Sequence, residues 1–217
     1  MRHPLNPHSG SIPLPDDPRL LRAARCAAEI SWRTVPYYNL RYGKRGWQFS
    51  LSDSAWMTTL PPCGRQQTLR QLRWLWRTLS NRGMPGWLLE QHLVVLRHQL
   101  MKHAPQQGAD WELLDAARRD LIEERSEILT EDEFDERARS FACIIGAPDH
   151  RLVLGSGYIL TSAAVDAVLG ANRAIFAVLE WFTDRQRFPP HWQHAARRCI
   201  DLDTPMLTVV HGAEDYG

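Results

Sequence analysis

The chain has 217 residues, of which 44% are hydrophobic and 24% are charged, a composition typical of a globular protein with one sizeable domain. No run of residues approaches the ~20 apolar residues of a membrane helix. The N-terminal stretch lacks the apolar centre of a secretory signal. These features argue against a membrane or secreted protein, so we expect a cytoplasmic protein with no membrane partner.

The formal net charge of +1 hides a division along the chain. Residues 1–105 carry 15 basic and 5 acidic side chains, a net charge of +10, whereas residues 106–217 carry 11 basic and 20 acidic side chains, a net charge of −9. Such an asymmetry has two interpretations: the halves pack with complementary surfaces, or they present a positive and a negative face to different partners.

An extended arm is predicted for residues 1–16, because this stretch is rich in proline and has little periodic apolar character. Helical order is expected to begin at Asp17-Pro18, since an acidic N-cap followed by proline favours a helix start. The apolar spacing carries this helix to about residue 32. The main helical domain is therefore expected to span residues 17–203, with a C-terminal tail over 204–217.

Two breaks are predicted in the next part of the chain. Pro36 is expected to interrupt or restart the helix, and Gly43 and Gly46 are expected to form a turn. A short helix is then predicted from residue 52 or 53 to about residue 60, where two prolines follow.

The clearest helical pattern comes next, with leucines at helical spacing over residues 64–80 and again from residue 85 to about 103. A short turn with glycine and proline separates these segments, which predicts an antiparallel helical hairpin.

The acidic half is also expected to be helical. The spacing Thr130-x-x-Glu133 is a capping box and predicts a helix start. Further helices are expected over residues 110–129, to about residue 145, over 151–188 as one long or two short helices bent near 170–172, and from 190 to about 200. Isolated strand signals lie at residues 152–154 and 207–210. The chain is thus predicted to be an all-α, single-domain multi-helix bundle.

The segment from Trp32 to Phe49 alternates cations with aromatic rings and contains no acidic residue. Guanidinium groups bind carboxylate and phosphate in a planar geometry, and flat rings pack against flat ligands. This pattern favours a binding site for an anionic or aromatic ligand. Its candidate residues are Arg33, Tyr37, Tyr38, Arg41, Tyr42, Arg45 and Trp47. The alternative is that the rings belong to the core and the cations line its rim.

Histidines offer a second kind of site. His92 lies in the middle of a predicted amphipathic helix beside its leucine stripe, which is a position suited to an axial ligand of haem. The alternative is a histidine that is simply hydrogen-bonded. A histidine-bearing helix that follows another amphipathic helix is loosely similar to the arrangement in a globin. His191 and His194 are spaced i, i+3 on the last helix and form a candidate metal-binding pair.

No spacing typical of a catalytic centre or a phosphate-binding loop occurs, so the sequence favours binding over catalysis. We therefore expect a non-enzymatic helical binding or regulatory module that contacts an anionic or aromatic small molecule, or a partner protein, through the arginine and aromatic segment. The acidic region 110–136 is expected to be a solvated face or to contact a basic partner. A haem- or metal-binding sensor or redox protein is the alternative. The acidic half argues against nucleic acid.

Overall fold

The computed structural model describes residues 5–6, 13–147 and 149–203. The described residues form an all-α, multi-helix fold without strands. The helices are α1 (Pro18–Thr34), α2 (Pro36–Met57), α3 (Arg65–Ser80), α4 (Gly86–His103), α5 (Gly108–Ser126), α6 (Glu131–Ile145), α7 (Arg151–Val168), α8 (Ala174–Phe182) and α9 (Pro190–Ile200). Two short 3₁₀ turns, η1 (Pro61–Cys63) and η2 (Pro105–Gln107), connect helices in the first half.

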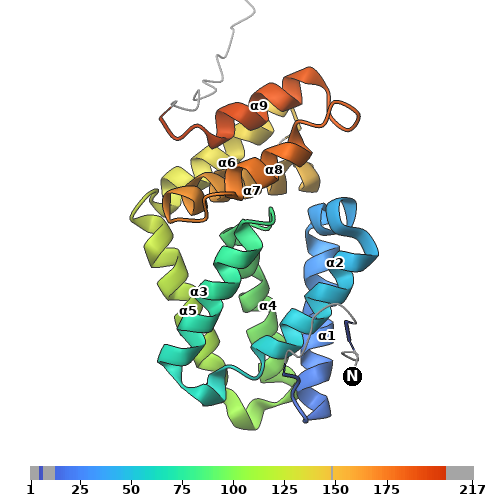
Figure 1. Ribbon diagram of the computed structural model, residues 1–217, viewed down its shortest axis with the longest axis vertical. Helices are drawn as coiled ribbons and strands as arrows, with labels where there is room; N and C mark the ends of the chain where they lie inside the picture. Colours follow the sequence, from blue (N-terminus) through green and yellow to red (C-terminus); the bar gives the residue numbers. More distant parts are fainter. Residues whose placement is uncertain (1–4, 7–12, 148, 204–217) are drawn as a thin grey trace, which may run out of the picture.

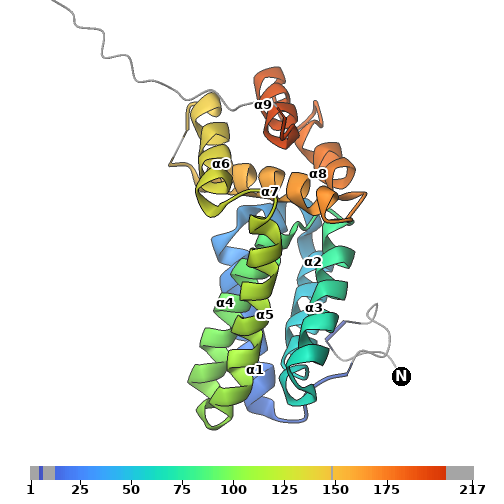
Figure 2. The ribbon, with the colours of Figure 1, turned by 90° about the vertical axis from the view of Figure 1, so that its left-hand side faces the viewer.

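The helices form two layers (Figures 1 and 2). Helices α1 to α5 run along the longest axis of the molecule, with α4 packed between α1 and α5. Helix α7 crosses one end of this bundle and contacts α2, α3 and α4. Helices α6, α8 and α9 pack against α7. The largest buried side chains, among them Trp111, Tyr37 and Phe182, come from both layers.

Asp166 of α7 connects the two layers. Its buried carboxylate accepts hydrogen bonds from Trp76 Nε1 at 3.1 Å, Ser80 Oγ at 2.7 Å and the Gly86 amide at 2.7 Å. Burial raises the pKa of Asp166 to about 6, against the opposing effect of these three donors. One side chain therefore ties the end of α3 and the beginning of α4 to the crossing helix.

Most predicted helix boundaries are confirmed. Asp17 caps α1 by accepting from the Arg19 amide at 2.8 Å, and Pro18 occupies the first turn. Thr130 and Glu133 form the expected reciprocal capping box at the start of α6. The segment 151–188 is divided into α7 and α8, as one of the two alternatives predicted. The strand signal at residues 152–154 was wrong, because these residues lie inside α7. The signal at 207–210 falls outside the described residues.

The prediction for residues 43–60 was right in part. Gly43 does break the helical backbone, since its φ of 51° and ψ of −148° are available to glycine and are not helical. The helix resumes directly after Gly43 and ends at Met57, so it begins earlier than predicted and Gly46 is not part of a turn. Gly46 lies within the helix and permits close packing, since a Cβ there would lie 2.3 Å from Tyr42 Cβ and 3.4 Å from the Trp32 ring. The close approach of Tyr42 and Trp32 therefore explains why a glycine occupies position 46. Local sequence signals do not report such a contact.

Some of the opposite charges of the two halves form ion pairs with each other inside the fold. Ion pairs join the basic helices α3 and α4 to the acidic helix α5, through Arg65 and Asp120 at 3.3 Å, Arg73 and Glu124, and Arg97 and Glu112. Glu90 of α4 and Arg125 of α5 form a further pair that is almost completely buried. The two halves thus meet through complementary charges, as one of the two interpretations predicted.

Candidate functional site

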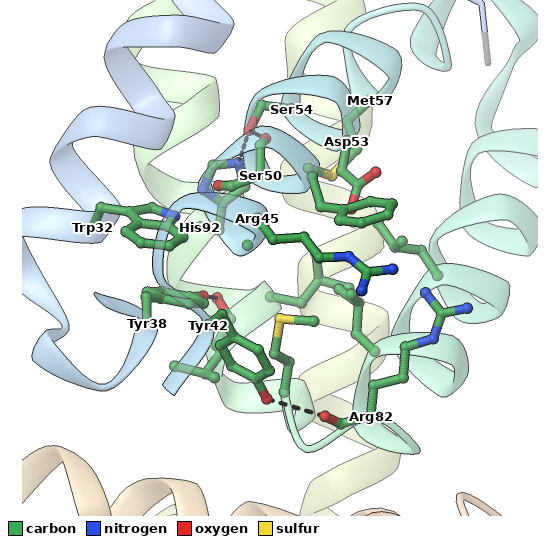
Figure 3. Close-up of a pocket in the computed structure, with 17 residues that line it drawn as sticks. Trp32, Tyr38, Tyr42, Arg45, Ser50, Asp53, Ser54, Met57, Arg82 and His92 are labelled. Atoms are coloured by element: carbon green, nitrogen blue, oxygen red, sulfur yellow. Dashed lines mark hydrogen bonds between the residues drawn. The ribbon is translucent and has the colours of Figure 1, made fainter. Parts of the chain in front are cut away.

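A cavity of about 500 Å³ lies between helices α1, α2, α3 and α4 (Figure 3). We call it the main cavity. Its volume falls within the range of roughly 300–1,000 Å³ that is usual for small-molecule sites. Its apolar walls are formed by Met57, Leu75, Leu79, Met84, Leu88 and Leu89, and its aromatic walls by Trp32, Tyr38, Tyr42 and Phe49.

Two arginines border the main cavity. Arg45 comes from α2 and Arg82 from the turn after α3, and Figure 3 shows their guanidinium groups on the same side of the cavity, directed toward each other. Both side chains are exposed. Within the described part of the chain, neither guanidinium forms a hydrogen bond or an ion pair. Two neighbouring cations without a bound carboxylate create a local positive potential at this rim.

Asp53 is the acidic residue of the main cavity, and it is half-buried beside this pair of arginines. Burial raises the pKa of Asp53 to about 7, although the positive charge of Arg82 and a hydrogen bond with Ser52 oppose the shift. The Asp53 carboxyl is therefore partly protonated near neutral pH and only partly balances the two arginines.

His92 forms part of the inner wall, where both of its ring nitrogens are hydrogen-bonded. Nε2 lies 2.9 Å from Ser54 Oγ, and Nδ1 lies 2.9 Å from Ser31 Oγ. The Ser54 hydroxyl donates to the Ser50 carbonyl oxygen at 2.6 Å, so its oxygen is left to accept from Nε2–H. The Ser31 hydroxyl then donates to Nδ1. Burial lowers the pKa of His92 to about 4, and the imidazole is neutral at physiological pH.

Trp32 supplies a free hydrogen-bond donor at this site. Its indole Nε1 is buried and has no partner within the described residues, although its ring is well packed. The ring stacks on Tyr38 at 5.7 Å between centroids and meets Trp47 edge to face at 5.5 Å. A buried donor without a partner carries a desolvation cost, which a ligand atom or a water molecule in the main cavity could offset.

The predicted ligand-binding residues are only partly brought together. Tyr38, Tyr42 and Arg45 line the main cavity. Tyr37 is a core residue with 1% exposure, and its hydroxyl donates to the Gly83 carbonyl oxygen at 2.6 Å. Arg41 donates to the Tyr37 hydroxyl and to the Ala177 carbonyl oxygen, so it connects α2 to α8.

The remaining two members, Arg33 and Trp47, lie on another face. They line a shallow hollow with Lys44 on the outer side of Trp32. The alternating pattern of cations and rings is therefore divided among the core, an interhelical contact, the main cavity and this hollow.

The histidine candidates also separate. Iron ligation by His92 would require the loss of its hydrogen bond with Ser54 or Ser31, and its role as a haem ligand stays a prediction. His191 and His194 are exposed on α9. Across residues 5–6, 13–147 and 149–203, no three His, Cys, Asp or Glu side chains gather into a group that could hold a metal ion.

Sequence reasoning missed Arg82, Asp53 and Ser54. Asp53 did carry a signal, since it is the one acidic residue between Glu29 and Glu90 in the sequence. Arg82 lies 37 positions after Arg45 in the chain, and only the packing of α3 against α2 and α4 brings the two to one cavity. No local pattern reports such a pairing.

Comparison of the chain with protein-family models, with curated proteins and with solved structures finds no match. Among the helices of the described residues, none has the length and apolar character needed to cross a membrane. The functional argument therefore depends on the geometry and chemistry of the main cavity.

Proposed function

We propose that this chain is a non-enzymatic binding protein for a small organic anion with an apolar or aromatic body. The anionic group binds Arg45 and Arg82 at the rim, and the body occupies the main cavity among its leucine, methionine and aromatic side chains. The observation that carries the proposal is a pair of arginines that form no ion pair within the described residues and border a largely apolar cavity of about 500 Å³.

The chemistry of the walls supports this class of ligand. A guanidinium pair provides several donors for a carboxylate, and charge-assisted hydrogen bonds of this kind are about twice as strong as neutral ones. The apolar walls favour a ligand that removes hydrocarbon or ring surface from water. The unpaired Nε1 of Trp32 adds one donor for a ligand oxygen.

The hydrogen bonds of Ser54 support binding rather than nucleophilic catalysis. A nucleophilic serine donates its proton to the neighbouring imidazole. Here the Ser54 hydroxyl donates to the Ser50 carbonyl oxygen instead, and His92 Nε2–H donates to Ser54. The hydrogen bond between Ser54 and His92 thus runs in the opposite direction to that of an activated serine nucleophile.

The proposal includes a cytoplasmic location, which the composition of the sequence supports. It also includes a basic partner for the acidic region 110–136. Part of that region is already engaged by Arg65 and Arg73, so such a partner would contact the exposed remainder, which includes Glu123, Glu127 and Asp132.

Isothermal titration with a matched pair of probes tests the binding function. The anion 1-naphthaleneacetate and its neutral amide, 1-naphthaleneacetamide, share one ring system and differ in charge. We expect the acid to bind more tightly than the amide. Replacing Arg45→Gln or Arg82→Gln should weaken binding of the acid by about tenfold each, since each removes charge-assisted hydrogen bonds, and should leave the amide almost unchanged.

Arg22→Gln is the matched control. Arg22 is an exposed arginine of α1 that forms no hydrogen bond or ion pair within the described residues, and it does not line the main cavity. Its replacement removes the same charge and should leave the affinity for the acid within about twofold, because an exposed charge away from the site is screened by salt. Equal binding of acid and amide by all four proteins, or no binding of the acid, would overturn the proposal.

A further inference from the structure

A second cavity adjoins the main one. Its volume is about 270 Å³, and it lies between α1, the start of α2, α4 and α7. We call it the rear cavity. Tyr38, Leu88 and His92 line both cavities and therefore form the partition between them. The rear cavity is small for a separate ligand, given the usual range of roughly 300–1,000 Å³, but it is a suitable size for an extension of the main cavity.

Most polar groups of the rear cavity are already hydrogen-bonded, although the exposed side chain of Gln91 forms no hydrogen bond within the described residues. Thr34 Oγ1 donates to the Ile30 carbonyl oxygen at 2.8 Å, and the Tyr37 hydroxyl donates to Gly83. Arg151 donates to the carbonyl oxygens of Arg33 and Thr34 at 2.7 and 2.6 Å. The guanidinium of Arg151 therefore caps the end of α1, in contrast to the unpaired guanidinium groups at the main cavity.

The two cavities therefore differ in chemical character. Unmet donors and free cations lie at the main cavity, at Trp32, Arg45 and Arg82. The rear cavity offers mainly apolar surface, from Val35, Val95, Leu152 and Leu154, and from the stacked rings of Trp87 and Tyr158, which are 4.9 Å apart. An anionic group is favoured at the first and a hydrocarbon chain at the second.

At Tyr38 the partition is held by one weak hydrogen bond and by stacking of the ring on Trp32. The Tyr38 hydroxyl lies 3.5 Å from the Leu88 carbonyl oxygen, at the outer limit of a hydrogen bond. Tyr38 also belongs to a short helical segment, residues 36–42, between the extended backbone of Val35 and the kink at Gly43. His92, the polar member of the partition, has both ring nitrogens satisfied and can contact a hydrocarbon chain without leaving a polar atom unpaired.

From these observations we propose that the ligand is a single-chain aliphatic carboxylate whose tail passes Tyr38 and occupies the rear cavity. This inference rests on the proposed function and specifies its ligand. Arg45 and Arg82 bind the carboxylate, the main cavity holds the first part of the chain, and the end of the chain lies against Trp87 and Tyr158. Entry turns the Tyr38 ring away from Leu88, at the loss of one weak hydrogen bond and of the stacking on Trp32.

Gly155 makes a sharp test possible. It lines the rear cavity from α7, its φ is not positive, and a Cβ placed on it would meet no atom within 4 Å. Replacing Gly155→Leu should therefore fill the rear cavity without opposing the helix. Gly155→Ala is the matched control, since it makes the same change of backbone and adds a single methyl group.

The probes are hexanoate, octanoate, decanoate, dodecanoate and tetradecanoate, measured by isothermal titration below their micelle concentrations. For the wild type, affinity should rise with chain length by up to about fourfold per buried methylene. Gly155→Leu should bind hexanoate like the wild type and tetradecanoate about tenfold or more weakly. Gly155→Ala should follow the wild type. Val95→Phe, which enters the rear cavity from α4, should repeat the effect of Gly155→Leu.

The outcomes separate this inference from the proposed function. If tetradecanoate binds Gly155→Leu and Val95→Phe as tightly as it binds the wild type, the tail does not use the rear cavity and the inference is wrong, while binding of 1-naphthaleneacetate still supports the proposed function. A wild-type affinity that is the same for all five acids also contradicts the inference. If neither the alkanoates nor 1-naphthaleneacetate bind, both proposals fail.

Discussion

Ser54 Oγ and His92 Nε2 lie 2.9 Å apart, and this hydrogen bond joins the kinked helix α2 to α4 at the inner wall of the main cavity. With the bond from Ser31 of α1 to Nδ1, the imidazole connects three helices. The structure therefore shows His92, which the sequence suggested as a metal ligand, as an interhelical contact, and this structural role can be measured by itself.

Replacing His92→Gln should reduce the dependence of stability on pH. The lowered pKa of His92, about 4 against 6.5, means that the unfolded chain binds a proton that the folded protein does not. The stabilisation is therefore complete above about pH 6.5 and is lost as pH falls toward 4, by about 3 kcal/mol in total. Urea unfolding at about pH 7 and pH 4.5 measures the change.

Carboxyl groups with raised pKa values change the free energy of unfolding with pH in the opposite direction to His92. The comparison is therefore between variant and wild type at each pH. The difference in unfolding free energy between wild type and His92→Gln should shrink by about 2–3 kcal/mol between the two pH values. A constant difference would mean that His92 does not titrate abnormally in the folded protein.

Binding of 1-naphthaleneacetate should weaken as pH rises through 7. The raised pKa of Asp53, about 7, keeps its carboxyl largely neutral at pH 6 and ionised at pH 8, where it repels the anion and competes for Arg82. We expect roughly a fivefold loss of affinity, typical of one partly screened charge. The ligand carboxylate stays ionised throughout this range, so it contributes no change.

Asp53→Asn provides the comparison for that titration. An amide cannot ionise, so the variant should bind the anion with an affinity that is nearly independent of pH and at least as high as that of the wild type at pH 6. If the affinity of the variant changes with pH as that of the wild type does, a group other than Asp53 causes the pH dependence.

The buried pair Glu90 and Arg125 should be sensitive to loss of one partner. Its closest approach is 3.2 Å, Arg125 stacks over Phe134 at 4.0 Å, and Arg125 Nη1 has no partner within the described residues. Replacing Glu90→Gln leaves Glu131, 2.8 Å from Arg125, as the remaining carboxylate partner of a buried guanidinium, and the expected cost is about 2–3 kcal/mol. Chemical denaturation at pH 7 measures it.

The exposed pair Arg25 and Glu29 is the control for this experiment. It has similar geometry, 3.0 Å on one face of α1, but both side chains are exposed. Glu29→Gln should therefore cost less than about 1 kcal/mol. Equal effects of Glu90→Gln and Glu29→Gln would show that burial does not determine the strength of these pairs.

Two alanine substitutions should have opposite signs. Gly43→Ala introduces a side chain at φ 51°, ψ −148°, and should destabilise the protein by about 1–3 kcal/mol even though no atom lies within 4 Å of the new Cβ. Gly155→Ala lies in open space inside α7 and should stabilise by about 0.5–1 kcal/mol. Thermal unfolding distinguishes them, and an unchanged or higher melting temperature for Gly43→Ala would exclude backbone strain at Gly43.

The helices were predictable where caps and periodicity agree. Thr130 and Glu133 mark the start of α6, and the leucine stripes mark α3 and α4, because a cap satisfies the first amides of a helix and an apolar stripe requires burial. The prediction was right that Gly43 breaks the helix, and it failed at Gly46, where glycine was interpreted as part of a turn. In the fold, one glycine forms a kink and the other allows Tyr42 and Trp32 to approach.

The site was predictable to a smaller degree. The sequence indicated an arginine and aromatic segment, and Tyr38, Tyr42 and Arg45 from it do line the main cavity. It did not separate them from Tyr37 and Arg41, which form contacts inside the fold. Whether a ring at a given position is exposed to a cavity or sealed in the core depends on the helix packed against it, and that helix comes from a distant part of the chain.

By itself, the sequence determined the all-α class, most helix boundaries and the unequal distribution of charge, because these follow from backbone capping, apolar periodicity and composition, which are local properties. The tertiary structure decided which cations stay unpaired, where a cavity opens and which polar atoms face it. Arg65, Arg73 and Arg97 form ion pairs with carboxylates of α5, whereas Arg45 and Arg82 form no ion pair within the described residues. The reason is that an ion pair or a cavity wall requires groups from separate helices to converge, and only the packing of those helices sets their distances.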